Sequence, residues 1–184
     1  MKIAYLAPEI PALSATFVYN EILALEALGT VAFSVHQPSA GVSDPKVERL
    51  RASVTHLYDT AIPSVFLAHI SLIMKSPIRY MHSLVTLLRD IWALGSLSRR
   101  AFGQVYRYFY AAKLAADLDK NECQHLHVHF AHTPTDIAMY ASLLSDVSFS
   151  VTAHANDLFE RGYLLNEKVG RAKFFATISE FNKG

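Results

Sequence analysis

The feature that most constrains the fold is a series of short apolar runs, each followed by a segment with a different spacing. The runs are "KIAYLA" (2–7), "VAFSVH" (31–36), "SVTHLY" (53–58), "HLHVHF" (125–130), "VSFSVTAH" (147–154) and "AKFFATIS" (172–179). Nearly continuous apolar runs of this length are typical of strands buried on both faces, as in a parallel sheet covered by helices. The sequence therefore predicts an α/β fold.

Segments with helical spacing lie between these runs. Residues 15–28 place Val18, Ile22 and Leu25 on one helix face, and Gly29 can end that helix. Further helices are expected at 45–51, at 135–144 and between the last two strands. Because strand–helix–strand connections within one sheet are right-handed crossovers, the strands should run parallel.

Residues 62–121 interrupt this alternation, because they contain no clear strand. Two apolar stripes at helical spacing predict two or three helices there: Leu84, Leu87, Leu88 and Ile91 in one, and Phe102, Val105, Phe109, Ala112 and Ala116 in the other. At 184 residues the chain suits one domain. We therefore expect a single domain over residues 1–184 with a helical block at 62–121.

Composition excludes several classes of protein. Hydrophobic residues make up 52% and charged residues 18%, which indicates a globular rather than a disordered chain. The net charge of +1 gives no indication of a nucleic-acid partner. Cys123 is the only cysteine, so no internal disulfide can form, and a reducing cytoplasm fits. The longest apolar candidate, residues 65–74, is too short to span a membrane.

Charge is distributed unevenly along the chain. Residues 75–113 carry seven basic side chains and one acidic side chain, Asp90, a local charge of +6. A basic, amphipathic block of helices predicts peripheral contact with an anionic membrane surface. The alternative is a solvated face of helices that pack on the core.

The stretch "QHLHVHFAH" (124–132) contains four histidines, of which three alternate along one strand face. Such a face can supply metal ligands. A metal-dependent hydrolase would use His127, His129 and His132 with Asp157. The chain has no HExxH motif and no cysteine cluster, and we expect no metal at these residues.

Position along the strands distinguishes the histidines. In an open parallel sheet, ligands bind at the carboxyl ends of the strands. His125 lies at the amino end of its strand and His127 in the middle, whereas His129 and His132 lie at the carboxyl end. His154 follows the next strand and should reach the same edge.

The loop after the first strand also carries polar side chains at this edge. Ser14 and Thr16 precede or begin a helix, where free backbone N–H groups can bind phosphate. No GxGxxG follows the first strand, so a dinucleotide cofactor bound in the usual way is not expected.

Four segments, in this order, resemble the N-terminal half of family-4 retaining glycosyltransferases of the GT-B fold. "PALSATFVYNEILALEALG" is similar to the family's "P..SETF..NEI..L...G", with Ala15 in place of the usual Glu. "HLHVHFAH" is similar to its "HxHF" strand, "TAHANDLF" to its "T.HA.D" strand end, and "FFATISEFNKG" to its "F..T.SEFN" segment. Residues 37–121 are the divergent part. The nearest likeness is to enzymes of exopolysaccharide and colanic-acid-type assembly.

The resemblance implies a doubly wound, Rossmann-like parallel sheet with a helical insertion, facing a second domain. That second domain would bind the nucleotide-sugar donor through an E-x7-E motif, which this chain lacks. We therefore expect residues 1–184 to be the acceptor-binding half, without the C-terminal donor-binding domain and inactive alone.

The resemblance also implies roles for individual residues. His154 is expected to contact the donor sugar near the reaction centre and to be the catalytic residue. Ser14 and Thr16 would face the donor phosphates or the acceptor, His129 would line the acceptor site, and Asp157 would orient His154 or cap the helix that follows. No cofactor is expected beyond the nucleotide-diphosphate sugar that serves as donor substrate.

The implied reaction transfers a hexose to a saccharide or lipid-linked acceptor with anomeric retention, as in polysaccharide biosynthesis. It would take place in the cytoplasm, at the inner face of the plasma membrane if the basic helices contact lipid. Two alternatives stay open: the metal-dependent hydrolase described above, and a non-catalytic Rossmann-like binding module.

Overall fold

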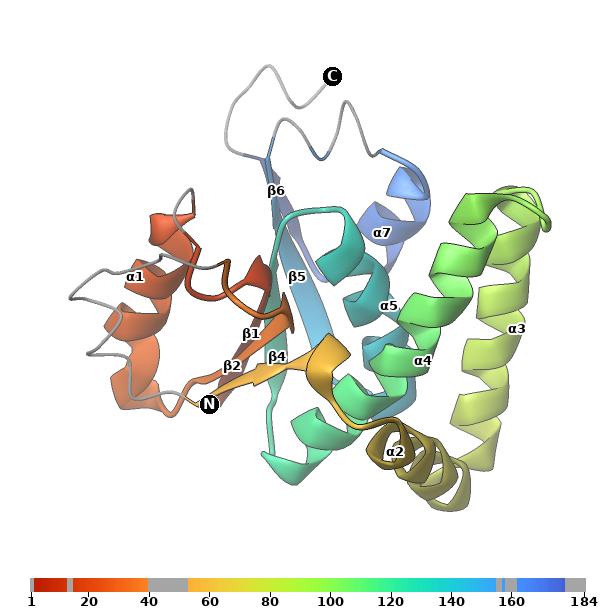
Figure 1. Cartoon of the computed structure of the whole chain (residues 1–184), viewed down its shortest axis with the longest axis horizontal. Coiled ribbons are helices and arrows are strands. Elements are labelled where there is room, and N and C mark those ends of the chain that lie inside the picture. Colours follow the sequence, from red (N-terminus) through yellow and green to blue (C-terminus); the bar gives the residue numbers. More distant parts are fainter. Residues whose placement is uncertain (1, 13–14, 40–52, 155–156, 158–161, 178–184) are drawn as a thin grey trace.

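Six parallel strands form one sheet in the order β3-β2-β1-β4-β5-β6 (Figure 1). The computed structural model describes residues 2–12, 15–39, 53–154, 157 and 162–177. Within them the strands are β1 (Ile3–Glu9), β2 (Val31–His36), β3 (Val54–His56), β4 (His125–His129), β5 (Ser148–Ala153) and β6 (Phe175–Thr177). This all-parallel sheet, covered by helices on both faces, confirms the predicted α/β, Rossmann-like doubly wound fold class.

The helices lie between the strands much as the spacing predicted. They are α1 (Thr16–Leu25), continued by the 3-10 turn η1 (Glu26–Leu28), then the 3-10 turn η3 (Leu57–Asp59), α2 (Ile62–Lys75), α3 (Pro77–Ala93), α4 (Arg99–Lys120), α5 (Thr133–Ser145) and α7 (Leu165–Arg171). The three helices α2, α3 and α4 form the predicted helical block. The helix expected at 45–51 lies outside the described residues.

Strand β1 shows why its run is continuously apolar. Tyr5 and Ala7 pack with α1 on one face of the sheet, while Ala4 and Leu6 join the main core on the other. Among the described helices, α1 lies on one side of the sheet in Figure 1, and α3, α4, α5 and α7 lie on the opposite side. Both faces of the strand are therefore removed from water, as the sequence pattern requires.

Several helix ends have identifiable causes. The Ser98 side chain accepts a hydrogen bond from the Ala101 N–H at 3.1 Å and so caps α4. The Nδ1 atom of His132 accepts from the Thr133 N–H at 2.8 Å and caps α5. Gly29 ends η1 with φ +80°, a left-handed conformation that favours glycine.

A buried carboxylate ties the helical block to the rest of the domain. Asp90 of α3 is 2% exposed and accepts two hydrogen bonds from the Arg171 guanidinium, at 2.7 and 2.6 Å. It also accepts a hydrogen bond from the Tyr140 hydroxyl at 2.6 Å. These contacts join α3 to α5 and α7 through one bidentate ion pair and one neutral donor.

We predict that Asp90→Ala destabilises the domain by about 3–5 kcal/mol, because it leaves a partly buried guanidinium and a buried hydroxyl without their acceptor. The control is Asp119→Ala. It breaks a pair with Lys75, whose side chain is 57% exposed, and should cost less than about 1 kcal/mol. Urea unfolding of both variants measures the difference, and equal losses would contradict the prediction.

The sheet order places a change of chain direction between β1 and β4. From β1 the chain proceeds to β2 and β3 on one side, then returns through the helical block to β4 on the other. In open α/β sheets, ligands bind outside the carboxyl ends of the strands at this switch point. The candidate site lies at that edge.

Candidate functional site

A polar cluster lies on the α1 side of the sheet, towards the carboxyl ends of β1 and β4. Tyr5 is in register with His127 on the neighbouring strand. Glu21 of α1 reaches down to this face and accepts a hydrogen bond from the Tyr5 hydroxyl at 2.8 Å. Its other oxygen lies 3.3 Å from Nε2 of His129. One carboxylate thus connects the helix to two adjacent strands.

The charge on Glu21 is stabilised by these neighbours. Contact with His129 and the Tyr5 hydrogen bond lower the pKa of Glu21 to about 2, against the opposing effect of burial. The Glu21 side chain is 42% exposed. An ionised carboxylate at the edge of the sheet is therefore present at neutral pH and open to solvent on one side.

His125 and His127 are held by hydroxyl groups of β5. His125 contacts the hydroxyls of Ser148 and Ser150, each at 2.8 Å. His127 places Nδ1 2.8 Å from the Ser150 hydroxyl and Nε2 3.2 Å from that of Thr152. Burial, and then the nearby His129, lower the pKa of His127 to about 4, so this ring is neutral at pH 7. The roles that the sequence left open for these two histidines are thus contacts within the sheet.

His129 differs from both, because it is buried without such partners. The residue is 2% exposed, and neither ring nitrogen makes a hydrogen bond within the described residues. Its ring stacks on Tyr5 with centroids 6.1 Å apart, and Phe17 of α1 meets it edge-on at 5.5 Å. A buried imidazole whose Nε2 faces a carboxylate at 3.3 Å without a hydrogen bond is uncommon and marks a candidate binding position.

His154 lies just beyond β5, at the same edge. Its ring packs between Phe130, with centroids 4.4 Å apart, and Phe17 at 4.9 Å. Burial lowers the pKa of His154, which keeps the imidazole neutral at pH 7. Its Nε2 atom is buried and has no hydrogen-bond partner among the described residues. The predicted catalytic residue therefore carries a free polar atom beside His129, whose ring centroid is 6.4 Å away.

Asp157 holds together the two loops that follow β4 and β5. It is 2% exposed, and its Oδ2 accepts from the backbone N–H groups of Ala131 at 2.8 Å and His154 at 3.0 Å. Its Oδ1 lies 3.7 Å from Nε2 of His132. Asp157 thus fixes His154 by accepting a hydrogen bond from its backbone N–H group, and not from its imidazole.

The loop after β4 contains a conformation that costs energy. Phe130 has φ +75°, a left-handed conformation that an aromatic residue rarely adopts. Three contacts hold it: its N–H donates to the Thr152 carbonyl at 2.9 Å, the Thr135 hydroxyl donates to its carbonyl at 2.8 Å, and Asp157 binds the next N–H. Strain that the surroundings enforce in this way is frequent at binding sites. Here it directs the Phe130 ring against His154.

Of the two residues predicted at the start of α1, only one is described. Thr16 is the first residue of the helix and is exposed. Ser14 lies outside the described residues. Thr16 directly precedes Phe17, which packs on both His129 and His154, so the start of α1 is next to the cluster.

The structure brings an acidic residue of α1 next to the histidine-rich strand β4. One ligand atom each from Glu21, His127 and His129 lie within 4.8 Å of one another, and such a set can hold a metal ion. This set differs from the one considered from the sequence, which combined the histidines with Asp157. The difference arises because Asp157 is committed to backbone N–H groups of the loops.

Sequence reasoning missed Tyr5, Phe17 and Glu21. Phe17 and Glu21 are four residues apart in α1 and therefore share a helix face, the one that crosses the histidine-rich strand. The available signal for Glu21 was its place in a helix next to the core-facing positions Val18 and Ile22. It could be assigned to His129 only once β1 and β4 were known to be neighbours.

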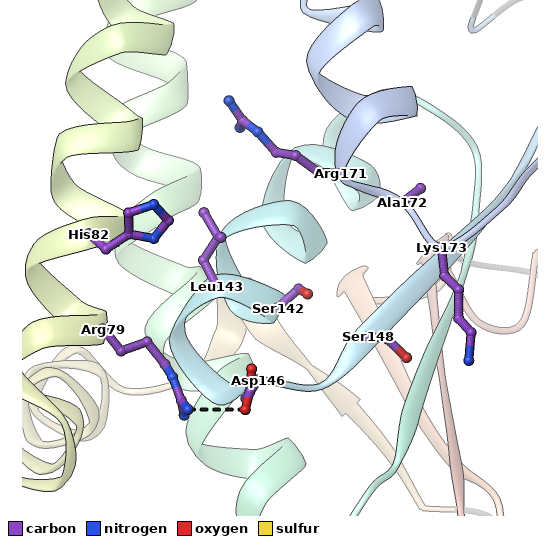
Figure 2. A pocket seen from close by; sticks show the side chains of 9 residues that line it. All are labelled: Arg79, His82, Ser142, Leu143, Asp146, Ser148, Arg171, Ala172 and Lys173. Carbon is purple, nitrogen blue, oxygen red and sulfur yellow. Dashed lines mark hydrogen bonds and ion pairs between the residues drawn. The ribbon is translucent and has the colours of Figure 1, made fainter.

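A separate cavity of about 500 Å³ lies at the opposite, amino end of β5 (Figure 2). None of the residues predicted for the site lines it. Its charged side chains largely have partners, since Arg79 pairs with Asp146 at 3.1 Å and Arg171 binds Asp90. Figure 2 shows the Arg171 side chain directed away from Lys173.

Comparisons with protein-family models, with curated proteins and with solved structures each find no match. Assignment of function therefore rests on the residues of this chain. None of the helices within the described residues combines the length and the apolar character needed to cross a bilayer.

The neutral His127 makes stability depend on pH. Its folded pKa of about 4 lies below the ordinary value of 6.5, so the unfolded chain takes up the proton first on acidification. Stability should therefore fall as pH drops from 6.5 towards 4, by at most about 1.4 kcal/mol per pH unit for this group. We predict that His127→Gln reduces this fall between pH 7 and 5.

Free energies of unfolding from urea titrations at several pH values test this. The exposed His36→Gln variant is the control and should keep the wild-type slope. A slope that His127→Gln leaves unchanged would contradict the assignment of a neutral, buried His127.

Proposed function

We propose that this chain is the acceptor-binding half of a retaining glycosyltransferase of the GT-B class. In this proposal it moves a hexose from a nucleotide-diphosphate sugar to a saccharide or lipid-linked acceptor, in the cytoplasm and in polysaccharide biosynthesis. The complete enzyme would include a donor-binding domain. Two observations support the proposal. Four sequence segments resemble the family, and polar residues of these segments, such as His154, lie at the carboxyl edge of the sheet.

The observation that carries the proposal is the position of His154. It follows β5 at the carboxyl edge, beside the switch point between β1 and β4, and its buried Nε2 atom has no partner among the described residues. The resemblance assigns the histidine at this position to the donor sugar. A neutral imidazole, which burial favours here, can donate one hydrogen bond to a sugar hydroxyl or oxygen.

The neighbouring residues would hold this group in place. Asp157 fixes the backbone of His154 through its N–H, and the rings of Phe17 and Phe130 restrict the imidazole from two sides. A donor that is already oriented stabilises developing charge without reorganisation during the reaction. The start of α1, at Thr16, would offer backbone N–H groups to the donor phosphates. The proposed transfer requires no metal, because such groups can stabilise the leaving diphosphate.

The test is His154→Ala in the enzyme that includes the donor-binding domain. Loss of one preorganised hydrogen-bond donor costs roughly 2.7–4 kcal/mol of barrier, so turnover should fall about a hundred- to a thousandfold. The free energy of unfolding should change far less, since His154 is only half-buried. His125→Ala, at the amino end of β4, is the matched control and should keep near wild-type turnover. Wild-type turnover by His154→Ala would remove this residue from the site.

A second candidate function is favoured by the set of Glu21, His127 and His129. Two histidines and one glutamate are the ligands of many catalytic zinc sites, with a fourth position for water. Ser150 contacts Nδ1 of His127 at 2.8 Å, as hydroxyls and carbonyls do behind metal-binding histidines. On this alternative the chain would be a metal-dependent hydrolase.

Metal analysis separates the two functions. For protein purified without added metal, the glycosyltransferase proposal predicts zinc well below one ion per chain, with no change in Glu21→Ala or His129→Ala. One zinc per chain, lost in both variants and retained in His125→Ala, would instead support the hydrolase. His125 is suitable as the control because it lies on the same strand but outside the three-residue set.

A further inference from the structure

Helix α3 has an unusual distribution of side chains, because its solvent-facing side is apolar. Five large apolar residues on it are 39–84% exposed: Ile78, Met81, Val85, Leu88 and Trp92. They are spaced by three, four, three and four residues and so form one stripe along the helix. The buried side of the same helix includes polar residues, namely Ser83, Thr86 and Asp90.

The polar residues of the buried side have partners inside the domain. Ser83 lies 2.7 Å from the Tyr108 hydroxyl, and the Thr86 hydroxyl donates to the His82 carbonyl at 2.9 Å. Asp90 binds Arg171 and Tyr140. The contacts of Ser83 and Asp90 reach other helices and fix the rotation of α3, so the apolar stripe is held towards solvent.

Helix α2 exposes apolar side chains as well. Val65, Ala68 and Leu72 face the core, while the opposite side carries six residues that are 43–80% exposed: Ile62, Phe66, Leu67, Ile70, Ile73 and Met74. Figure 1 shows α2 and α3 at the margin of the molecule, with α4 between α3 and the sheet. Soluble monomers rarely leave so many large apolar side chains exposed on adjacent elements. We refer to the eleven exposed residues of α2 and α3 as the apolar face.

The exposed charged side chains of these two helices and of the start of α4 are all basic. Residues 62–100 contain five basic side chains and one acidic side chain, Asp90, which is buried. Lys75 and Arg79 pair with acids elsewhere in the domain. Arg89 is exposed and borders the stripe of α3. Helix α4 begins with the exposed Arg99 and Arg100, of which Arg100 lies over the Tyr163 ring, 5.5 Å from its centroid.

The charge pattern favours an anionic surface over a second copy of this chain. The spacing of the α3 stripe would suit a helix pair, but helix pairs match opposite charges beside their seam. Here the positions next to the stripe hold His82 and Arg89, and no exposed acid lies on either described helix. Two copies would bring like charges together, whereas an anionic membrane would complement them.

We propose that the apolar face of α2 and α3 lies in the interfacial layer of an anionic membrane, with Arg89 and Arg99 contacting lipid headgroups. Burial of apolar side chains in that layer and attraction of basic groups to anionic lipid act together. The proposal rests on the exposed surface of the helical block and does not depend on the glycosyltransferase function.

The chain contains its own reporter for this interaction. Trp92 is the only tryptophan and is 81% exposed, at the end of the stripe. On addition of vesicles with about one third phosphatidylglycerol in phosphatidylcholine, its emission should shift to shorter wavelength and be quenched by brominated acyl chains. Each basic group near the surface contributes about fivefold to partitioning, equivalent to about 1 kcal/mol, so pure phosphatidylcholine vesicles should bind far less protein.

Variants separate this proposal from its rivals. Met81→Asp and Leu88→Asp should each lower binding in vesicle sedimentation at least tenfold, and Arg89→Gln about fivefold. The matched control is Val169→Asp on α7, which is 48% exposed and lies outside the apolar face, and it should bind as wild type. Circular dichroism verifies that each variant is folded.

Three results would overturn the proposal. One is binding to anionic vesicles without any change in Trp92 emission. Another is equal binding to neutral and anionic vesicles. The third is a concentration-dependent dimer, seen by analytical ultracentrifugation and abolished by Met81→Asp, in a protein that does not bind lipid.

Discussion

The structure depends on the central position of β1, which pairs in parallel with β2 on one side and β4 on the other. Both of its faces are covered and both of its edges are hydrogen-bonded, so residues 4–7 of the strand are buried. This pairing brings residue 5 beside residue 127, although 121 residues of chain separate them. It also puts the change of chain direction next to the first loop, and the polar cluster of Tyr5, Glu21 and His129 forms there.

The same pairing explains why the three alternating histidines have different environments. All three point to the α1 side, yet the hydroxyls of β5 satisfy His125 and His127. His129 instead lies under Phe17 and has the short contact with Glu21, at 3.3 Å, although a nitrogen of His127 is also within 4.8 Å of that carboxylate. A repeating pattern along one strand therefore produces three different environments, because the covering elements differ along its length.

The helical block shows a second consequence of packing. In α3 the polar residues Ser83 and Asp90 are used inside the domain together with Leu87, and a stripe of five apolar residues is left on the outside. Usual amphipathic packing has the reverse arrangement. Contacts with Tyr108, Tyr140 and Arg171 compensate for the buried polar groups, and the exposed apolar stripe then needs an environment other than water.

The sequence by itself determined the fold class, because continuous apolar runs allow few arrangements other than a parallel sheet with helices on both faces. It also identified His129 and His154 as residues of the carboxyl edge, since direction along a strand can be read from the chain. The sequence did not reveal that Glu21 joins them, that Asp157 binds backbone rather than imidazole, or which side of α3 faces solvent. Those features depend on which strands are neighbours and on how each helix is rotated. Only tertiary packing decides that rotation, because the periodicity of a helix with apolar residues on two sides is compatible with either side being buried.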